Sequence, residues 1–343
     1  MLIYFVVAFI SSFLIYKYSQ SQKKVFLILS FIPFFLVMAL RYGIGYDYLA
    51  IYTPIFKHIV SGVNVNWDIG MVILCKIIGI FSKDEFFFFF ITSAITSIFF
   101  YKSIIENSDF PWMSLLIYVI GGMYIDSLNV VRQYVAISIF IYSLKYVRNK
   151  DFIKYLFLII IASLFHNSAF MLIPAYWLLS SKPSLKRNII LLLIMISLMP
   201  VANMLFLKLI SITKYSYYID SSYGSANPTY SELIISSILL IISILFSKQN
   251  KNNINYNIYS NMTFLFFCTS LLSFKILLAY RLVMYFKISM IFLIPTIIKT
   301  TVKPKDKMLL FTVIVIMLSS ITLIGAYKFN WYDTDYISIF DKN

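Results

Sequence analysis

Residues 25–40, VFLILSFIPFFLVMAL, form an uncharged apolar run, and runs of this kind decide the fold class. A membrane hydrocarbon core of about 30 Å needs roughly 17–25 apolar residues per helix, and slightly fewer where flanking side chains reach the interface. The chain has 343 residues, of which 61% are hydrophobic and 13% charged. Ordinary soluble domains have about 45–50% apolar and about 25% charged residues. The sequence therefore predicts an all-α polytopic membrane protein, with residues 1–343 forming a single integral membrane domain.

The apolar runs predict about twelve transmembrane helices. Nine runs are long enough to be assigned directly, and short polar turns separate three shorter ones. The predicted spans are 1–16, 25–40, 86–101, 112–125, 128–147, 151–165, 168–180, 188–207, 231–247, 258–274, 281–298 and 308–325. A further stretch, residues 67–81 (WDIGMVILCKIIGIF), is ambiguous because Asp68 and Lys76 interrupt it.

The distribution of basic residues decides whether residues 67–81 cross the membrane. If they do not, one set of short loops holds 17 of the 29 basic residues and four acidic residues, whereas the other set holds 12 basic and 10 acidic residues. Cytoplasmic loops carry an excess of Lys and Arg. We therefore assign the first set to the cytoplasm and both termini to the outside. Residues 67–81 are then predicted to form a re-entrant or interfacial helix.

The same charge asymmetry accounts for the net charge of +15, so no nucleic acid is expected as a partner. Cys75 and Cys268 both lie in apolar segments, and the chain has two histidines, so neither a disulfide framework nor a metal site is predicted. The longest polar stretches, 41–66 and 211–230, are predicted to be outer loops. Their tyrosine, serine and asparagine residues suit sugar binding, and they are equally typical of any hydrated membrane loop.

Ionisable residues at the edges of spans are the candidate site, because each costs about 2.5–3.5 kcal/mol on insertion scales and usually faces a cavity. All of them fall at the predicted outer face. They are Arg41, Asp47 and Tyr48 after the second span; Asn129, Arg132 and Gln133, whose i, i+3, i+4 spacing predicts one helical face; His166 between two short spans; and Arg281 with Tyr285 at the start of another.

Three arginines at one membrane face indicate an anionic ligand, because a guanidinium group matches phosphate oxygens and stays charged when desolvated. A lipid diphosphate suits this position, since its charge lies at headgroup depth while its tail lies between helices. Packing explanations remain open: Arg41 could anchor the end of a span, and His166 could hydrogen-bond between helices. Asp333 and Asp335 resemble the acidic pair of soluble glycosyltransferases, but nucleotide-sugars are not available at the outer face.

Five motifs, in order along nearly the whole chain, carry a resemblance to a known family. They are RYGIGYDYLAIY (41–52), NVVRQYVA (129–136), FHNSAF (165–170), YRLVMYF (280–286) and YDTDYISIF (332–340). Together they resemble the EpsG family of bacterial exopolysaccharide proteins, which belongs with the Wzy-type polysaccharide and O-antigen polymerases. The tail departs from the family pattern, because Asp335 stands where a proline is expected before the tyrosine.

The resemblance implies a multi-pass protein of the bacterial cytoplasmic (inner) membrane with its active site at the outer, periplasmic face. Its activity would be that of a metal-independent glycosyltransferase without a cofactor, acting in exopolysaccharide, capsule or O-antigen synthesis. The growing glycan would be transferred from undecaprenyl diphosphate to the non-reducing end of another lipid-linked repeat unit. The undecaprenyl-diphosphate-linked oligosaccharide is thus both donor and acceptor, membrane lipids are partners, and a chain-length regulator is left open as a further one.

In such a reaction Arg132 and Arg281 would bind the donor diphosphate and stabilise the charge on the leaving group. Arg41 would join this cluster or pair with Asp47. Asp47 or His166 would accept the proton of the acceptor hydroxyl, and both alternatives stay open here. The residues expected to orient sugar or phosphate oxygens are Tyr48, Asn129, Gln133 and Tyr285.

Two other functions are compatible with parts of this pattern. Another polyprenyl-lipid-dependent glycosyltransferase or ligase would share the chemistry of the site and differ in the length of its product. A lipid-linked oligosaccharide flippase would need charges through the midplane and two similar halves, and the sequence shows neither.

Overall fold

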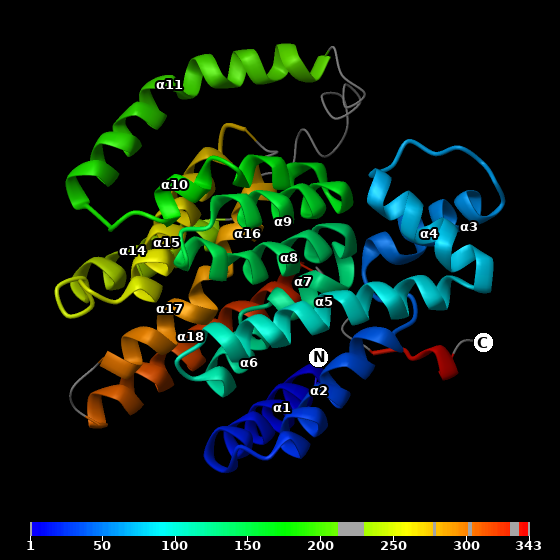
Figure 1. The fold of residues 1–343 in the computed structure, drawn as a ribbon, viewed down its shortest axis with the longest axis horizontal. Helices are drawn as coiled ribbons and strands as arrows, with labels where there is room; N and C mark the ends of the chain where they lie inside the picture. The colour runs from blue at the N-terminus through cyan, green and yellow to red at the C-terminus, as the bar shows by residue number, and fades with distance from the viewer. Residues whose placement is uncertain (1, 212–229, 277–278, 301–303, 330–335, 342–343) are drawn as a thin grey trace. The chain divides into compact units, whose positions relative to one another are not determined.

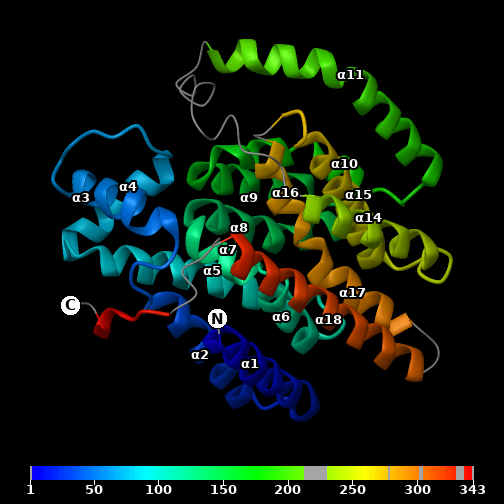
Figure 2. The same ribbon diagram turned by 180° about the vertical axis from the view of Figure 1, so that it is seen from behind.

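The computed structural model describes residues 2–211, 230–276, 279–300, 304–329 and 336–341 (Figures 1 and 2). Within these ranges the regular structure is helical, with one isolated antiparallel bridge between Arg41 and Ser338. The predicted outer loop 211–230 and the acidic pair Asp333 and Asp335 lie almost wholly or wholly outside the described residues.

The chain divides into two compact units, residues 1–173 with 294–343, and residues 174–293. The first unit contains α1 (Leu2–Ser21), α2 (Lys24–Ala39), η1 (Tyr48–Tyr52), α3 (Thr53–Val60), α4 (Ile69–Phe81), α5 (Glu85–Asn107), α6 (Pro111–Ile120), α7 (Met123–Asn129), α8 (Val131–Arg148), α9 (Phe152–Phe165), η2 (Asn167–Leu172), the end of α17 (Ser289–Thr300), α18 (Pro304–Phe329) and η4 (Ile339–Asp341). The second contains α10 (Ala175–Leu179), α11 (Leu185–Ser211), α14 (Tyr230–Leu245), α15 (Ile254–Leu272), α16 (Tyr280–Lys287) and the start of α17.

Several of these helices are long and apolar enough to cross a membrane. Among the described residues four pass this test, namely Leu2–Ser21, Glu85–Asn107, Tyr280–Thr300 and Asp306–Leu323. A fifth would be the pair α6 and α7, which is bent by 58°. The helical fold and its membrane character therefore agree with the sequence, while the number of about twelve crossings stays a prediction.

The predicted spans 112–125 and 168–180 are broken in the structure. The run 112–125 is interrupted at Gly121 and Gly122, and Gly122 adopts the left-handed conformation (φ +79°) that separates α6 from α7. The run 168–180 is a short 3₁₀ helix followed by the five-residue α10, with Pro174 between them. Proline lacks the N–H that would continue the helical hydrogen bonding.

The core of the first unit is built around α8, which is buried along nearly all of its length between α5 and α9. Small polar residues of α5 allow α2 to approach closely, as is typical of helix contacts in membranes. Ser93 Oγ donates to the Met38 carbonyl (3.2 Å), and Ser97 Oγ donates to Met38 Sδ (3.3 Å). Figures 1 and 2 both show α3 and α4 lying beside the first turns of α5.

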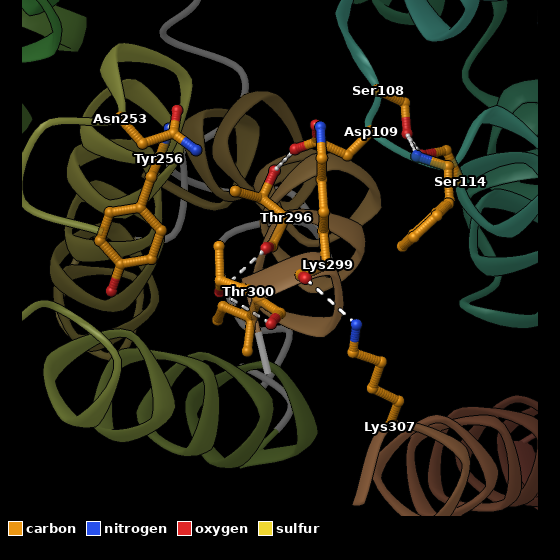
Figure 3. A network of polar contacts seen from close by, with 11 residues as sticks. Ser108, Asp109, Ser114, Asn253, Tyr256, Thr296, Lys299, Thr300 and Lys307 are labelled. Carbon is orange, nitrogen blue, oxygen red and sulfur yellow. Dashed lines mark hydrogen bonds and ion pairs between the residues drawn. The ribbon is translucent and has the colours of Figure 1, made fainter. Parts of the chain in front are cut away.

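Contacts between loops of the first unit follow the two sets predicted from charge. In the predicted cytoplasmic set, Asp109 accepts hydrogen bonds from Thr296 Oγ1 (2.8 Å) and Lys299 Nζ (2.6 Å), as Figure 3 shows. Arg148, at the end of α8, donates to Asn107, at the end of α5. In the predicted outer set, the bridge between Arg41 and Ser338 brings the C-terminal segment to the end of α2.

Candidate functional site

The glycines of RYGIGYD shape the turn that follows α2. Gly43 (φ +65°) and Gly45 (φ +92°) both adopt left-handed conformations that favour glycine. The turn then lies against the end of α7, where the Asp47 N–H donates to Asn129 Oδ1 (3.0 Å). A Cβ on Gly45 would come within 3.0 Å of the Asn129 Cα, so only glycine permits this approach. The turn thus places the half-buried Asp47 at the start of η1.

The Arg41 side chain is buried and forms hydrogen bonds within the protein. Its side chain is 1% exposed and donates to the Met38 carbonyl, to Ser93 Oγ (3.1 Å) and to the Leu128 carbonyl (3.2 Å). Among the described residues no carboxylate lies within ion-pair distance of Arg41, so the expected pairing with Asp47 is not formed. These contacts tie α2, α5 and α7 together, and they give Arg41 a packing role.

Tyr48 and the C-terminal tail complete this packing. The ring of the buried Tyr48 stacks on Phe89, with centroids 3.7 Å apart and planes 8° apart. In the tail, the Ile337 carbonyl accepts from the Tyr42 N–H (2.8 Å), and the Ile339 N–H donates to the Leu40 carbonyl (2.9 Å). Two motifs almost 300 residues apart are therefore joined next to Arg41.

The predicted common face of Asn129, Arg132 and Gln133 is wrong. The helix breaks at Val130 (φ −94°, ψ 56°), so Asn129 ends α7 while the other two residues begin α8. The helical i, i+3 spacing does not extend across such a break. Asn129 contacts Asp47 instead, Arg132 contacts Asp68, and Gln133 is buried with no exposed surface.

Arg132, Asp68 and His166 form the charged cluster of the first unit. Arg132 Nη1 lies 2.6 Å from Asp68 Oδ2, and His166 Nδ1 lies 3.9 Å from the same oxygen. The side chains are 24%, 6% and 14% exposed, respectively. The three residues come from the start of α8, the residue before α4 and the end of α9. The sequence predicts Arg132 and His166 as site residues, and the structure brings them together through Asp68.

Aromatic rings line one side of this cluster. The guanidinium carbon of Arg132 lies 5.0 Å from the centroid of the Trp67 ring, a distance typical of a cation–π contact. Tyr52, at the end of η1, packs against Trp67 with ring centroids 6.0 Å apart. These rings fix the guanidinium group and exclude water from part of its surface.

Gly70 permits α4 to bring Asp68 to this position. A Cβ on Gly70 would lie 2.8 Å from the Leu164 carbonyl oxygen, which belongs to the last turn of α9. Real Cβ atoms do not approach a backbone oxygen this closely, so only glycine allows the two helices to lie in contact here. Because Asp68 precedes α4 and His166 follows α9, this close approach sets the distance between the two side chains.

The surroundings of Asp68 keep its carboxyl group ionised. Burial alone raises the pKa of Asp68, but the neighbouring His166 side chain and the Arg132 guanidinium lower it below its usual range. Asp68 is therefore a buried carboxylate that stabilises the cationic Arg132 and the proton-accepting His166.

Asp68, Trp67 and Tyr52 are not among the site residues predicted from the sequence. The position of Asp68 in the sequence indicates a different role. It directly precedes the apolar run 69–81, where an aspartate normally caps the helix through its side chain. In the structure the carboxylate makes no such cap and is directed to Arg132 instead. An ionisable residue at the edge of an apolar run needs a partner. This requirement is the sequence feature that could have indicated Asp68 as a site residue.

The other predicted site residues lie in the second unit. Arg281 is half-buried and Tyr285 is fully buried, both on α16. The same helix ends at Lys287, whose Nζ lies 2.9 Å from Glu232 Oε1 at the start of α14. The participation of Arg281 and Tyr285 in the site stays a prediction.

A metal site would need several donor side chains close together. Across the described part of the chain, no group of three or more His, Cys, Asp or Glu residues is arranged to hold a metal ion.

Comparison with known proteins gives one match. The model of the EpsG family matches residues 24–336, and this range includes α2, the whole Arg132 cluster and residues 332–336 of the tail motif. No curated protein and no solved structure matches the chain. Because the family match covers nearly the whole sequence, the chain belongs to the EpsG family.

Proposed function

We propose that this protein is a polysaccharide polymerase that works on undecaprenyl-diphosphate-linked repeat units at the outer face of the bacterial cytoplasmic membrane. Membership of the EpsG family indicates an exopolysaccharide-related, glycosyltransferase-like polymerase. The lipid-linked substrate, the outer-face site and the metal-independent mechanism are our additions to that assignment.

The observation that carries the proposal is the Arg132 cluster. It holds a partly exposed guanidinium group, an imidazole and a fixed carboxylate at one end of α8 and α9. The guanidinium group suits the diphosphate of the donor, because it offers a planar set of donors that stays charged when water is excluded. The imidazole can take up a proton near neutral pH. These are the two groups that transfer of a glycan from a diphosphate requires.

The reaction then has a simple balance. The acceptor hydroxyl gives its proton to the base as its oxygen forms a bond to the anomeric carbon of the donor glycan. The bond from that carbon to the diphosphate oxygen breaks, and undecaprenyl diphosphate leaves with the electron pair. Arg132 stabilises the negative charge that develops on this leaving group. We place Arg281 on the same diphosphate, and Asn129, Gln133, Tyr48 and Tyr285 among the residues that orient the substrates.

The contacts between loops support the outer location of this site. Residues of the predicted outer set contact one another, as Asp47 does with Asn129 and Asp68 does with Arg132. The basic residue Arg148 marks the opposite end of α8, where the predicted cytoplasmic loops meet. Under the positive-inside rule, this arrangement supports an outer location for the Arg132 end of α8.

The proposed topology has about twelve crossings and one helix, α4, that enters the membrane edge without crossing it. At 13 residues and about 1.5 Å per residue, α4 is about 20 Å long, which is less than the hydrocarbon thickness. Residue Asp68 at its start and the polar residues before it then stay at the outer face.

Deletion of the gene in its own host, followed by complementation, tests the proposal. Wild-type protein, Arg132→Ala and the matched control Lys154→Ala are each expressed, and lipid-linked glycans and surface polysaccharide are profiled. Lys154 is exposed at the start of α9, at the opposite end of this helix from His166, so its loss removes an equal charge away from the site.

We expect single repeat units to accumulate on the outer leaflet in the deletion strain, with polymer restored by wild type and Lys154→Ala but not by Arg132→Ala. Repeat units trapped on the cytoplasmic leaflet would indicate a flippase instead. Transfer of single units to a different acceptor would indicate a ligase. Full polymer from the Arg132→Ala strain would contradict the role given to this arginine.

A further inference from the structure

We infer that Asp68 is the positioning residue of the polymerase site, and that it makes His166, rather than Asp47, the base that takes the proton of the acceptor hydroxyl. The inference rests on the proposed function. It deepens that function by adding a residue that the sequence motifs do not contain and by choosing between two candidate bases.

One oxygen of the Asp68 carboxylate lies close to both groups that take part in the proposed reaction, the Arg132 guanidinium and the His166 imidazole. Asp68 Oδ2 lies 2.6 Å from Arg132 Nη1 and 3.9 Å from His166 Nδ1. The base and the diphosphate-binding guanidinium therefore both lie within ion-pair distance of a single atom. The reaction needs both groups at the same anomeric carbon, one for the acceptor hydroxyl and one for the leaving diphosphate.

Asp68 itself is a poor base, because its carboxylate is already paired with Arg132 and binds a proton weakly. Its carboxylate is buried and already neutralises Arg132, and these contacts lower its pKa. A carboxylate beside an imidazole instead orients the ring through one nitrogen and stabilises the imidazolium that forms when the other nitrogen takes a proton. Nδ1 is the His166 nitrogen nearer to Asp68, and we assign the role of proton acceptor to Nε2, which is buried.

Asp47 is the competing candidate for the base. The Asp47 N–H donates to Asn129, and the charge of Asp47 acts on Tyr52, which packs against Trp67. No ion pair joins Asp47 to Arg132 among the described residues. We therefore assign Asp47 to the turn and to the aromatic side of the site.

The titratable groups that act on Arg132 include Asp68, before α4, and Tyr52, at the end of η1, while Asp47, before η1, acts on Tyr52. Of these, Asp68 lies within ion-pair distance of both Arg132 and His166. Removing its charge should therefore change the pH dependence of the base more than removing the charge of Asp47.

The test is the pH profile of kcat/KM for purified full-length protein in lipid, using lipid-linked repeat units isolated from the deletion strain as both substrates. The variants are Asp68→Asn, Asp68→Glu, His166→Gln and Asp47→Asn. We expect Asp68→Asn to lower kcat at least about tenfold and to move the acidic limb of the profile by about one pH unit toward lower pH, because the imidazolium loses a negative charge about 4 Å away.

We expect His166→Gln to lose about 10²- to 10⁴-fold in kcat and to abolish the acidic limb, while Asp47→Asn keeps the limb where it is. Asp68→Glu retains the charge and is expected to keep the limb with a lower kcat. Asp68→Asn leaves Arg132 without its counter-ion. If that variant fails to fold, Asp68→Glu still tests the inference.

Loss of the acidic limb in Asp47→Asn, together with an unchanged limb in Asp68→Asn or in His166→Gln, would overturn the inference and make Asp47 the base. Polymerisation by the wild-type protein is measured first. Its absence would refute the proposed function, whereas a wild-type polymer with an Asp68-independent profile would refute the inference alone.

Discussion

Replacement of Gly70 by alanine tests how the site is assembled, because Gly70 is outside the chemistry and a Cβ added there would meet Leu164 of α9. The added Cβ would lie 2.8 Å from the Leu164 carbonyl oxygen, where ordinary contact begins at 3.4 Å. The start of α4 must therefore retreat from α9 by about 0.6 Å. Overpacking of this kind typically costs about 1–3 kcal/mol.

The same shift separates the reacting groups. Asp68 moves with α4, so its distance of 3.9 Å from His166 lengthens, while His166 stays with α9. A misplacement of about 1 Å can lower a rate about 100-fold. We expect Gly70→Ala to lower kcat for polymerisation about 10- to 100-fold, and to lower the free energy of unfolding by about 1–3 kcal/mol.

Gly79→Ala is the matched control, since it places the same substitution in the same helix. Its Cβ would lie 2.8 Å from Val60 Cγ1, which is a side chain rather than backbone and lies on α3, away from Asp68. The assays are thermal unfolding in detergent and polymerisation of purified lipid-linked units. We expect Gly79→Ala to be destabilised without a comparable loss of kcat. Wild-type kcat in a folded Gly70→Ala protein would refute the claim that this contact sets the site.

Four further outcomes follow from the structure. Gly45→Ala should lower the melting temperature more than Gly62→Ala, because both have positive φ but only Gly45 also meets backbone, and equal losses would contradict this. Arg41→Lys should cost about 1–3 kcal/mol for each acceptor left without a donor, and a changed KM at unchanged stability would instead indicate substrate binding. Removing residues 336–343 should cost about 1–3 kcal/mol, from two backbone hydrogen bonds, on thermal unfolding. The pKa of Asp68 is lower in the folded than in the unfolded state, where it is about 3.9. Its contribution to stability is therefore present above that value and is lost as the pH falls below it. Asp68→Asn should not show this loss of stability at acidic pH.

The helices were largely predictable from the sequence, whereas their interruptions were not. Long apolar runs leave a membrane helix as the main way to satisfy backbone hydrogen bonds, and the predicted spans fall on helical segments. The breaks at Gly122 and Val130 depend on how neighbouring segments pack, which hydrophobicity does not record. The extrapolation of one helical face from Asn129 to Gln133 failed for this reason.

The candidate site was partly predictable for a related reason. Charge at the edges of spans selected Arg132 and His166, because such charges are costly unless they have a partner. The partner, Asp68, lies 64 residues from Arg132 in sequence, and only the close packing at Gly70 brings it there. Arg41 satisfied the same sequence criterion, yet its acceptors are main-chain and hydroxyl oxygens. A sequence pattern of charges does not distinguish these two cases.

The most direct measurement of the central claim is polymerisation by the purified protein alone. Protein reconstituted in liposomes receives lipid-linked repeat units on the face that exposes the Arg132 cluster, and glycan length and released undecaprenyl diphosphate are both measured. We expect lengthening glycans, one undecaprenyl diphosphate released for each new linkage, and neither product from Arg132→Ala. Units that cross the bilayer unchanged, or glycans that lengthen equally with Arg132→Ala, would contradict the proposed polymerase reaction.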